Sequence, residues 1–495
     1  MPIIPYIKNS FRGGLSDESS NGISGSFKYA YGCDIHKRRD SLSCNWVMSN
    51  IANSSVVKDC IRFAVTAKDG STYCFGSAGS VYAISGNPND PVVSGVYNDE
   101  NGEIRGAAEW QLNDGNNYLY WATATSVARM ALNGSVDTPW AAGVVTQDYK
   151  TTLDNHSYHA MKVANGVLCI ANGDFLATFE YDGEFNPAAM NIRPGNIIKC
   201  LEERDDYIII GSERKDTAEE GYIWTWILDN LSWSQKRRIP VRGINALIDT
   251  ERLLLQGGSD GEIFFSDFSN VAPLNSVYSR GKCNNQVGVY NDLALFGMYG
   301  CDEPSVAGLY SYGRRSLNRP FAFNNEFRLT RTIAGSTVSE IGGTWMASSA
   351  VFASWKTTDE STLEYGVDMA SSSTRATARY EGLEWDGGAP HLKKKYITEK
   401  LTFLPLPSGC SISFLFKKDC ATTGGDSSAG AGWKYAKIAN GTSTSYSVEG
   451  STEAEFIINE TAKVFETAIE LTPSGSYTPE IISSVGYIND VTLEH

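Results

Sequence analysis

A two-strand unit recurs along most of this 495-residue chain. Each copy contains a short apolar strand, a polar turn with Gly, Ser or Asp, and a second apolar or aromatic strand. The copies lie at 69–84, 115–132, 164–181, 206–226, 251–268, 290–314 and, more weakly, 344–367. Their starts are about 40–50 residues apart, which is the length of one four-stranded propeller blade. The spacing therefore predicts a β-propeller of about seven blades.

The composition agrees with an all-β chain. Aromatic residues (25 Tyr, 20 Phe and 11 Trp) favour strands, and 47 Gly residues suit many turns. Long apolar stripes with a helical period are hard to find. Two stacked sheets remain the alternative for the repeat region. Because the third and fourth strands of each blade are poorly marked, a blade number of six or eight also stays open.

Changes in composition divide the chain into three parts. Residues 1–30 are rich in Gly, Ser and Pro, and we expect them to form an extended N-terminal arm. Residues 31–385 are assigned to the propeller; within them, 31–60 could supply a strand that closes the ring by pairing with 375–383. Residues 386–495 show period-2 apolar patterning between turns, which predicts a C-terminal β-sandwich.

The net charge of −15 argues against tight binding of phosphates, although it is compatible with a channel through which DNA slides. The chain starts without a recognisable signal peptide and contains no apolar run long enough for a membrane span. The ten cysteines are scattered and form no Cys-x-x-Cys pair, so a zinc ribbon is not expected. We expect no cofactor and no metal.

Catalytic motifs are scarce. The sequence contains neither a phosphate-binding Gly-x-x-x-x-Gly-Lys-Ser/Thr loop nor a Gly-x-Ser-x-Gly elbow. The densest acidic cluster contains Glu202, Glu203, Asp205 and Asp206. Paired carboxylates perform glycoside hydrolysis, but this cluster falls at a turn between two strands, where solvated acidic residues are common.

Three further groups of residues were weighed as binding sites. His156 and His159 have a spacing at which they could share a metal, but no further ligand is spaced alongside them. The segment 97–104 resembles a calcium loop in composition and departs from its ligand spacing. Trp224 and Trp226 share one face of a strand and could, with Trp233, stack on a sugar, although aromatic residues between blades are more often core.

Both ends of the chain carry segments with a family resemblance. FRGGLSDESSNGISGSF at 11–27, followed by YGCDIHKRRDSLSC at 31–44, resembles the N-terminal region of tailed-phage virion proteins. VFETAIELTPSGSYTPEIISSVGYI at 464–488 resembles a strand pair that closes phage structural β-sandwiches. Together with the repeats, the chain looks like a podophage tail nozzle or tail-hub protein.

This resemblance implies a structural virion protein and not an enzyme. It implies a ring of six copies below the portal and adaptor proteins that lines and gates the channel for DNA ejection. The protein would be assembled in the host cytoplasm and reside in the virion tail, with double-stranded DNA passing without specific binding and tail fibres or spikes as further partners. Phe11, Arg12, Gly13, Gly14 and Leu15 would form an assembly arm that docks on a neighbouring subunit or on the adaptor.

Two other functions stay open. The chain could be a receptor- or glycan-binding propeller of a tail fibre or tip, which predicts exposed aromatic residues clustered on one propeller face. It could also be a propeller glycoside hydrolase, which predicts that turnover depends on two carboxylates, with the cluster at 202–206 as the first candidates.

Overall fold

The structure is a computed structural model of the chain. It describes residues 3–16, 25–37, 40–87, 90–100, 102–113, 115–132, 153–216, 220–228, 230–276, 280–303, 306–315, 317, 319–358, 363–439 and 441–490.

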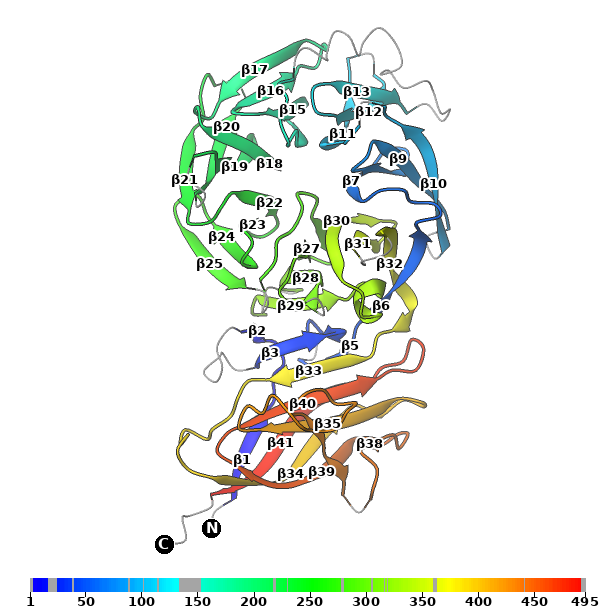
Figure 1. Cartoon of the computed structure of the whole chain (residues 1–495), viewed down its shortest axis with the longest axis vertical. Coiled ribbons are helices and arrows are strands. Elements are labelled where there is room, and N and C mark those ends of the chain that lie inside the picture. The colour runs from blue at the N-terminus through cyan, green and yellow to red at the C-terminus, as the bar shows by residue number, and fades with distance from the viewer. Residues whose placement is uncertain are drawn as a thin grey trace.

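Seven small antiparallel sheets, arranged around a common axis, make up the larger domain (Figure 1). Blade 1 contains β7 (Ile61–Thr66), β8 (Thr72–Gly76), β9 (Ser80–Asn87) and β10 (Asp90–Asn98). Blade 2 contains β11 (Gly106–Gln111), β12 (Asn117–Ala122) and β13 (Val127–Ala131). Blade 3 contains β14 (Met161–Ala164), β15 (Val167–Asn172), β16 (Phe175–Phe179) and β17 (Phe185–Asn191). Blade 4 contains β18 (Asn196–Arg204), β19 (Tyr207–Arg214), β20 (Gly221–Ile227) and β21 (Gln235–Ile239). Blade 5 contains β22 (Ile244–Asp249), β23 (Leu253–Gly257), β24 (Glu262–Ser266) and β25 (Val271–Ser276). Blade 6 contains β26 (Gly288–Tyr290), β27 (Leu293–Met298), β28 (Gly308–Gly313) and β29 (Ala322–Phe327). The seventh contains β30 (Val338–Ala347), β31 (Ala350–Thr358), β32 (Leu363–Arg375) and β6 (Trp46–Asn53). The prediction of a propeller of about seven blades is confirmed.

The recurring sequence unit corresponds to the second and third strands of each blade. In blade 6 these strands, β27 and β28, are buried at every position. A central strand of a blade has neighbouring blades on both of its faces, so its sequence becomes apolar throughout. This is why the hairpin formed by the second and third strands of each blade stands out in the sequence, whereas the first and fourth strands do not.

The ring closes in blade 7, where a strand from the N-terminal part of the chain completes the sheet. β6 pairs antiparallel with β32, with Gly366 opposite Asn53 and Met369 opposite Ser49. The prediction that 31–60 supplies a closing strand is confirmed. The predicted partner at 375–383 is wrong, because β32 ends at Arg375 and the next strand belongs to the other domain.

Two seven-stranded sheets make up the second domain. The first, here called the terminal sheet, contains β1 (Ile3–Lys8), β4 (Cys33–Asp34), β5 (Leu42–Cys44), β34 (Lys394–Phe403), β37 (Lys437–Ile438), β39 (Glu453–Ala462) and β41 (Glu480–Asp490). The second, here called the junction sheet, contains β2 (Gly14–Leu15), β3 (Ser26–Tyr31), β33 (Ala378–Gly382), β35 (Ser411–Lys418), β36 (Lys434–Tyr435), β38 (Ser445–Tyr446) and β40 (Phe465–Thr472).

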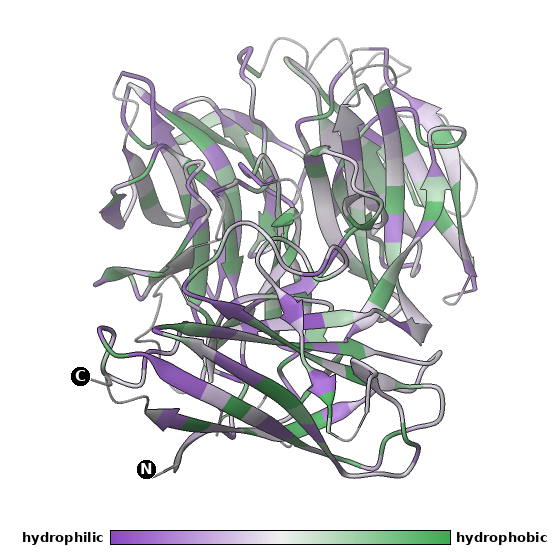
Figure 2. Ribbon diagram, turned by 60° about the horizontal axis from the view of Figure 1, so that its bottom comes forward, coloured by the Kyte–Doolittle hydropathy of each residue, from purple (hydrophilic) through white to green (hydrophobic). Residues whose placement is uncertain are grey.

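The two sheets pack face to face around one apolar core. The rings of Phe414 and Phe456 meet across the interface at 6.1 Å, and those of Tyr396 and Phe465 at 5.2 Å. Strand β39 shows the alternation that such packing requires, since its even-numbered residues up to Ile458 are buried and its odd-numbered residues are exposed. Figure 2 shows hydrophilic and hydrophobic residues alternating along strands of this domain.

The N-terminal segment differs from its expected form. Its described residues do not form an arm, because β1 pairs with β41 near the other end of the chain, with Ile3 opposite Asn489 and Lys8 opposite Ser484. Strand β3 pairs with β33. The sandwich therefore begins with the N-terminal strands and resumes after Arg375, so the predicted boundaries at 30 and 385 do not coincide with those of the structure.

The sandwich lies beside the propeller, next to blades 6 and 7, and both chain ends lie at its far side (Figure 1). Residues of β2 and β3 lie against β29, the outermost strand of blade 6. The one helix among the described residues is α2 (Thr330–Ile333), a single turn between blades 6 and 7.

Candidate functional site

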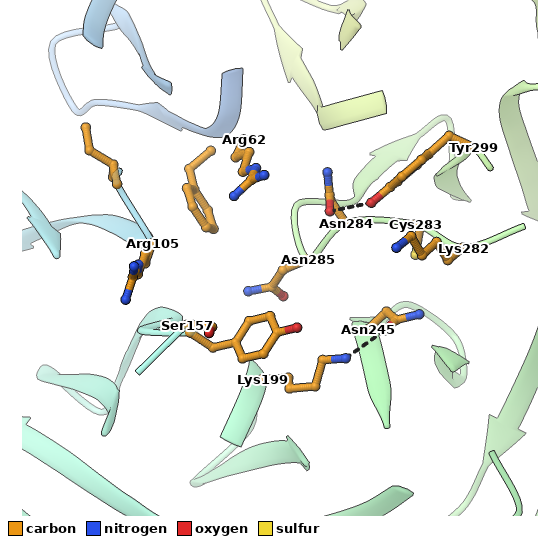
Figure 3. A pocket seen from close by; sticks show the side chains of 13 residues that line it. Arg62, Arg105, Ser157, Lys199, Asn245, Lys282, Cys283, Asn284, Asn285 and Tyr299 are labelled. Carbon is orange, nitrogen blue, oxygen red and sulfur yellow. Dashed lines mark hydrogen bonds between the residues drawn. The ribbon is translucent and has the colours of Figure 1, made fainter. Parts of the chain in front are cut away.

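A cavity of about 150 Å³ lies on the propeller axis, where the first strands of the blades begin. Basic side chains from several blades line it: Arg62 comes from blade 1, Arg105 from the approach to blade 2 and Lys199 from blade 4. Lys282 precedes blade 6. Figure 3 shows these side chains around a central opening, with Asn285 near its middle. Because seven blades contribute to one axis, residues far apart in the sequence meet there.

The acidic residues next to this cavity are already bound to its cations. Glu340 lies 2.9 Å from Nε of Arg62, and Glu103 forms ion pairs with both Arg62 and Arg105. Glu213 lies 3.1 Å from Nζ of Lys199. These carboxylates are therefore held by the walls of the cavity.

Several donors at the cavity remain uncommitted. Among the described residues, the side chains of Lys282, Asn285 and Ser157 have no hydrogen-bond or ion-pair partner. The backbones of Lys282 and Tyr299 are hydrogen-bonded, and the Lys282 side chain contacts the tyrosine ring, with Nζ 5.6 Å from the ring centroid. The cavity therefore presents hydrogen-bond donors and positive charge, while the opposing carboxylates are neutralised.

Tyr299, Asn284 and Cys283 form a fixed wall on one side. The Tyr299 hydroxyl donates to Oδ1 of Asn284 at 3.0 Å, and Asn284 donates to Glu340. Burial raises the pKa of the Cys283 thiol. The nucleophilic form of a cysteine is the thiolate, so this thiol is unsuited to covalent catalysis.

The residues predicted to form an assembly arm lie at the junction between the two domains. The Phe11 side chain is fully buried and meets the ring of Tyr380 edge-on at 5.3 Å. Arg12 pairs with Asp40 at 2.9 Å. Leu15 is also buried, and it belongs to the same apolar core as residues of both domains.

The two glycines of this segment allow the chain to approach other backbone segments closely. A Cβ on Gly13 would lie 2.2 Å from the amide nitrogen of Ser26. Gly14 has φ +80°, and a Cβ there would lie 2.9 Å from the amide nitrogen of Phe323 in blade 6. In the described structure, Phe11–Leu15 therefore bind within their own chain.

A buried carboxylate completes this junction. Glu326 of β29 accepts hydrogen bonds from Asn45 at 2.9 Å, Ser311 at 2.8 Å and Asn324 at 3.0 Å. Arg315 lies 3.7 Å from its other side. Asn45 directly precedes β6, so this network joins the connection between the domains to blade 6.

The DIH sequence of the resemblance reaches the same network. Asp34 lies 3.5 Å from Arg315, and Ile35 is fully buried. His36 lies 4.0 Å from Glu326, and burial lowers its pKa. The sequence analysis assigned no role to Glu326, because nothing in its local pattern distinguishes it from an exposed strand residue.

A second cavity of about 420 Å³ lies between the domains, with Tyr29, Arg328 and Trp433 in its walls. Two of its basic residues are paired with acidic ones, since Arg379 lies 2.7 Å from Glu381 and Lys417 lies 3.2 Å from Glu466. The guanidinium of Arg328 lies 4.4 Å from the centroid of the Tyr31 ring.

The acidic cluster at 202–206 lies where it was expected. Asp205 and Asp206 are exposed in the tight turn between β18 and β19. Glu202 forms an ion pair with Lys162, and Glu203 is exposed. The structure places no opposing carboxylate pair across a cavity at this turn.

The two histidines do not converge on a metal. Both ring nitrogens of buried His159 contact carbonyl oxygens, at 2.7 Å to Ala171 and 3.0 Å to Ala124. In the described part of the chain, one group could bring three metal-ligating atoms together, namely Glu384, Cys420 and Glu466. Lys28 lies 3.5 Å from Glu384 and 3.3 Å from Glu466, so these carboxylates already have a cation.

The tryptophan group and the segment 97–104 both contribute buried side chains to the propeller. Trp224 and Trp226 are buried, and their indole N–H groups donate to Ser212 and to the carbonyl of Asn230. In the segment 97–104, the buried Asp99 accepts a hydrogen bond from Trp121 at 2.7 Å. Glu103 is held by the arginines of the axial cavity.

Sequence reasoning missed the axial cations. The recurring unit was recognised from the second and third strands of each blade, whereas Arg62 and Lys199 lie on first strands. Arg105 and Lys282 lie just before such strands. These cations stand seven to ten residues before the copies at 69, 115, 206 and 290, without a fixed spacing, so no local pattern marks them.

Neither a protein-family model nor a characterised protein sequence matches this chain. Among the described residues, no helix is long and apolar enough to cross a membrane. Solved propellers are similar in structure, including the WD40 β-propeller domain of Doa1 (TM-score 0.43, 11% identity, 65% of this chain and 97% of that chain). The C-terminal WD40 domain of Sif2 is similar with TM-score 0.41 and 10% identity over 66% of this chain and 99% of that chain. The propeller assignment itself rests on the sheet topology of this chain.

Proposed function

We propose that this chain is a structural protein of a phage tail, forming a ring with six copies as the expected number, below the portal and adaptor, around the DNA ejection channel. The observation that carries the proposal is the position of the N-terminal segments with the phage resemblance. FRGGL and DIH both lie in the junction that holds the sandwich against blade 6.

A rigid two-domain unit suits such a ring. Two chain crossings connect the domains, one before β6 and one after β32, and a buried apolar core continues from one domain into the other. The Glu326 network adds hydrogen bonds between the domain connection and blade 6 in a medium of low dielectric constant, where each bond is stronger than in water. A tail ring must keep its subunits in one shape while DNA is held under pressure above it.

The charge and the candidate catalytic groups also support a structural role. The net charge of −15 disfavours adhesion of the DNA backbone, which suits passage of DNA without specific binding. The acidic cluster at 202–206 lies in an exposed turn, and the Cys283 thiol is held in its neutral form.

Contacts between copies would use surfaces other than Phe11–Leu15. On the outer face of the terminal sheet, Pro5, Thr398 and Ile457 lie in one row with Tyr487, across four paired strands. Ile457 is 42% exposed and Ile7, also on this face, is 58% exposed. Exposed apolar side chains of this kind are typical of protein–protein contacts.

Quantitative mass spectrometry of purified phage particles tests the proposal. The amount of this chain is measured against the major capsid protein, and we expect a fixed ratio corresponding to about six copies per particle. Cryo-electron microscopy of the same particles should then place the propeller in a ring at the tail. Absence of the chain from intact particles would show that it is not a virion component.

A further inference from the structure

We infer that the axial cavity of the propeller is a binding site for a small organic anion, a carboxylate or a phosphate ester. This inference does not depend on the proposed tail role. It rests on four cations from four blade regions that converge on one cavity, together with donors that have no partner within the described chain.

The charges at the cavity favour an anion. Four cationic side chains line it, whereas three carboxylates, Glu103, Glu213 and Glu340, form the ion pairs that neutralise three of the positive charges. Lys282 remains without an acidic partner among the described residues. This ammonium and the neighbouring guanidinium groups would form charge-assisted hydrogen bonds with an oxyanion, which are stronger than hydrogen bonds between neutral groups.

The neutral donors favour a ligand with oxygen acceptors. Asn285 points into the cavity, and Ser157 lies across from it (Figure 3). Tyr158 also lines the cavity. None of these three side-chain polar groups donates to another described residue. An amide and hydroxyl groups beside an ammonium are the donors that bind a carboxylate or phosphate and neighbouring hydroxyl groups.

The walls are already arranged for a ligand. Lys199 is held by Glu213 and by Oδ1 of Asn245 at 2.9 Å, and its ammonium lies 5.0 Å from the ring centroid of Tyr158. Tyr299 is fixed by Asn284. Binding would therefore order few side chains, which lowers its entropic cost.

Isothermal titration calorimetry of the full chain, at constant ionic strength, tests this site with three matched probes. Glucuronate carries a carboxylate, glucose 6-phosphate carries a phosphate ester, and glucose is the neutral control. We expect saturable binding of at least one anion, with glucose at least about tenfold weaker, because it lacks the charge-assisted hydrogen bonds. The anion that binds more tightly identifies the preferred oxyanion.

Two variants locate the binding. Lys282→Ala should weaken binding of the anion by about tenfold or more, and Asn285→Asp should weaken it further by placing a carboxylate in the cavity. Lys393→Ala removes the same charge from the sandwich surface and should leave the affinity unchanged. Thermal melts of each variant verify folding.

The inference is overturned if neither anion binds, if glucose binds as tightly as the anions, or if Lys282→Ala keeps wild-type affinity. Should Asn285→Asp fail to fold, Lys282→Ala still decides, because the side chain of Lys282 is exposed and forms no ion pair on which folding could depend.

Discussion

The propeller and the sandwich contain similar strands but are assembled from the chain in opposite ways. In blade 4, β18, β19, β20 and β21 are consecutive in sequence and pair as neighbours. In the sandwich, β1 pairs with β41, and β33 pairs with β3 and β40. Consecutive hairpins leave a local, repeating signal, whereas pairing between the two chain ends depends on contacts that no local pattern records.

The comparison leads to different expectations for mutations in the two regions. A change at the junction removes contacts among the N-terminal segment, blade 6 and the sandwich, so its effect should be large. A change in a hairpin turn of a blade affects one local connection. The following variants test this difference, beginning with the largest expected effect.

Phe11→Ala should lower the free energy of unfolding by about 3–5 kcal/mol, because it leaves a cavity where a fully buried ring packs against Tyr380. Urea denaturation followed by tryptophan fluorescence measures the change. Ile7→Ala, also in the N-terminal segment but 58% exposed, is the matched control and should cost less than about 1 kcal/mol. Equal effects of both variants would contradict a buried role for Phe11.

Glu399 should make the sandwich less stable as the pH rises from about 4.5 to 7. Burial raises the pKa of its carboxyl to about 7, while Tyr396 and Ser484 hydrogen-bond to it. The folded state then binds the Glu399 proton more tightly than the unfolded state. Protonation of Glu399 therefore contributes its full stabilisation below the unfolded pKa, and this contribution is lost as the pH rises through the folded pKa. Over this pH range the free energy of unfolding should fall by about 3 kcal/mol.

Denaturation at pH 5 and at pH 7.5 measures this dependence. Glu399→Gln cannot ionise and should reduce the difference between the two pH values by about that amount. Glu455→Gln is the control, because this residue is exposed on the neighbouring strand β39. Lys8 titrates nearby with its pKa lowered to about 8 by burial, and it acts above this range. An unchanged pH profile for Glu399→Gln would disprove the assignment.

Glu326→Gln should cost about 2 kcal/mol, because the new amide presents N–H groups to side chains that already donate. Asn45 and Asn324 donate to the carboxylate in the native junction. The control, Glu251→Gln, removes an exposed ion pair with Arg314 and should change stability by less than about 0.5 kcal/mol. If the two variants are equally stable, the buried network does not hold the domains together.

Asp205→Gly should stabilise the protein slightly, by at most about 1 kcal/mol, because Asp205 has φ +51° in the turn between β18 and β19. Thermal denaturation measures the shift in melting temperature. Asp206→Gly, at the next position, lies outside the residues with positive φ and should give no gain. A large loss of stability from Asp205→Gly would show that this turn has a role beyond connecting two strands.

Much of the propeller could be predicted from its sequence. In each blade the hairpin formed by the second and third strands is apolar on both faces, because it lies between two neighbouring blades, and it is followed by polar turn residues. The closing strand at Trp46–Asn53 was also expected, but its partner was not, because β32 and β33 are adjacent in sequence and belong to different domains. Only long-range pairing distinguishes them.

The candidate site was less predictable. Arg62, Lys199 and Lys282 are ordinary polar positions beside the ends of strands, and nothing in the chain links them until the ring closes. Phe11–Leu15 were noticed because of their glycines and their family resemblance, but their expected role as an arm was inferred from flexible composition. In the structure those glycines allow close backbone contact with Ser26 and Phe323.

The sequence by itself determined the all-β class, a propeller of about seven blades and the position of the hairpin formed by the second and third strands of each blade, because these depend on residues that are neighbours in the chain. Tertiary structure alone decided that the N-terminal strands β1 to β5 complete the sandwich, that Glu326 becomes a buried link between the domains, and that four cations meet on one axis. These features arise from contacts between residues hundreds of positions apart, which hydrophobic periodicity and turn chemistry do not encode.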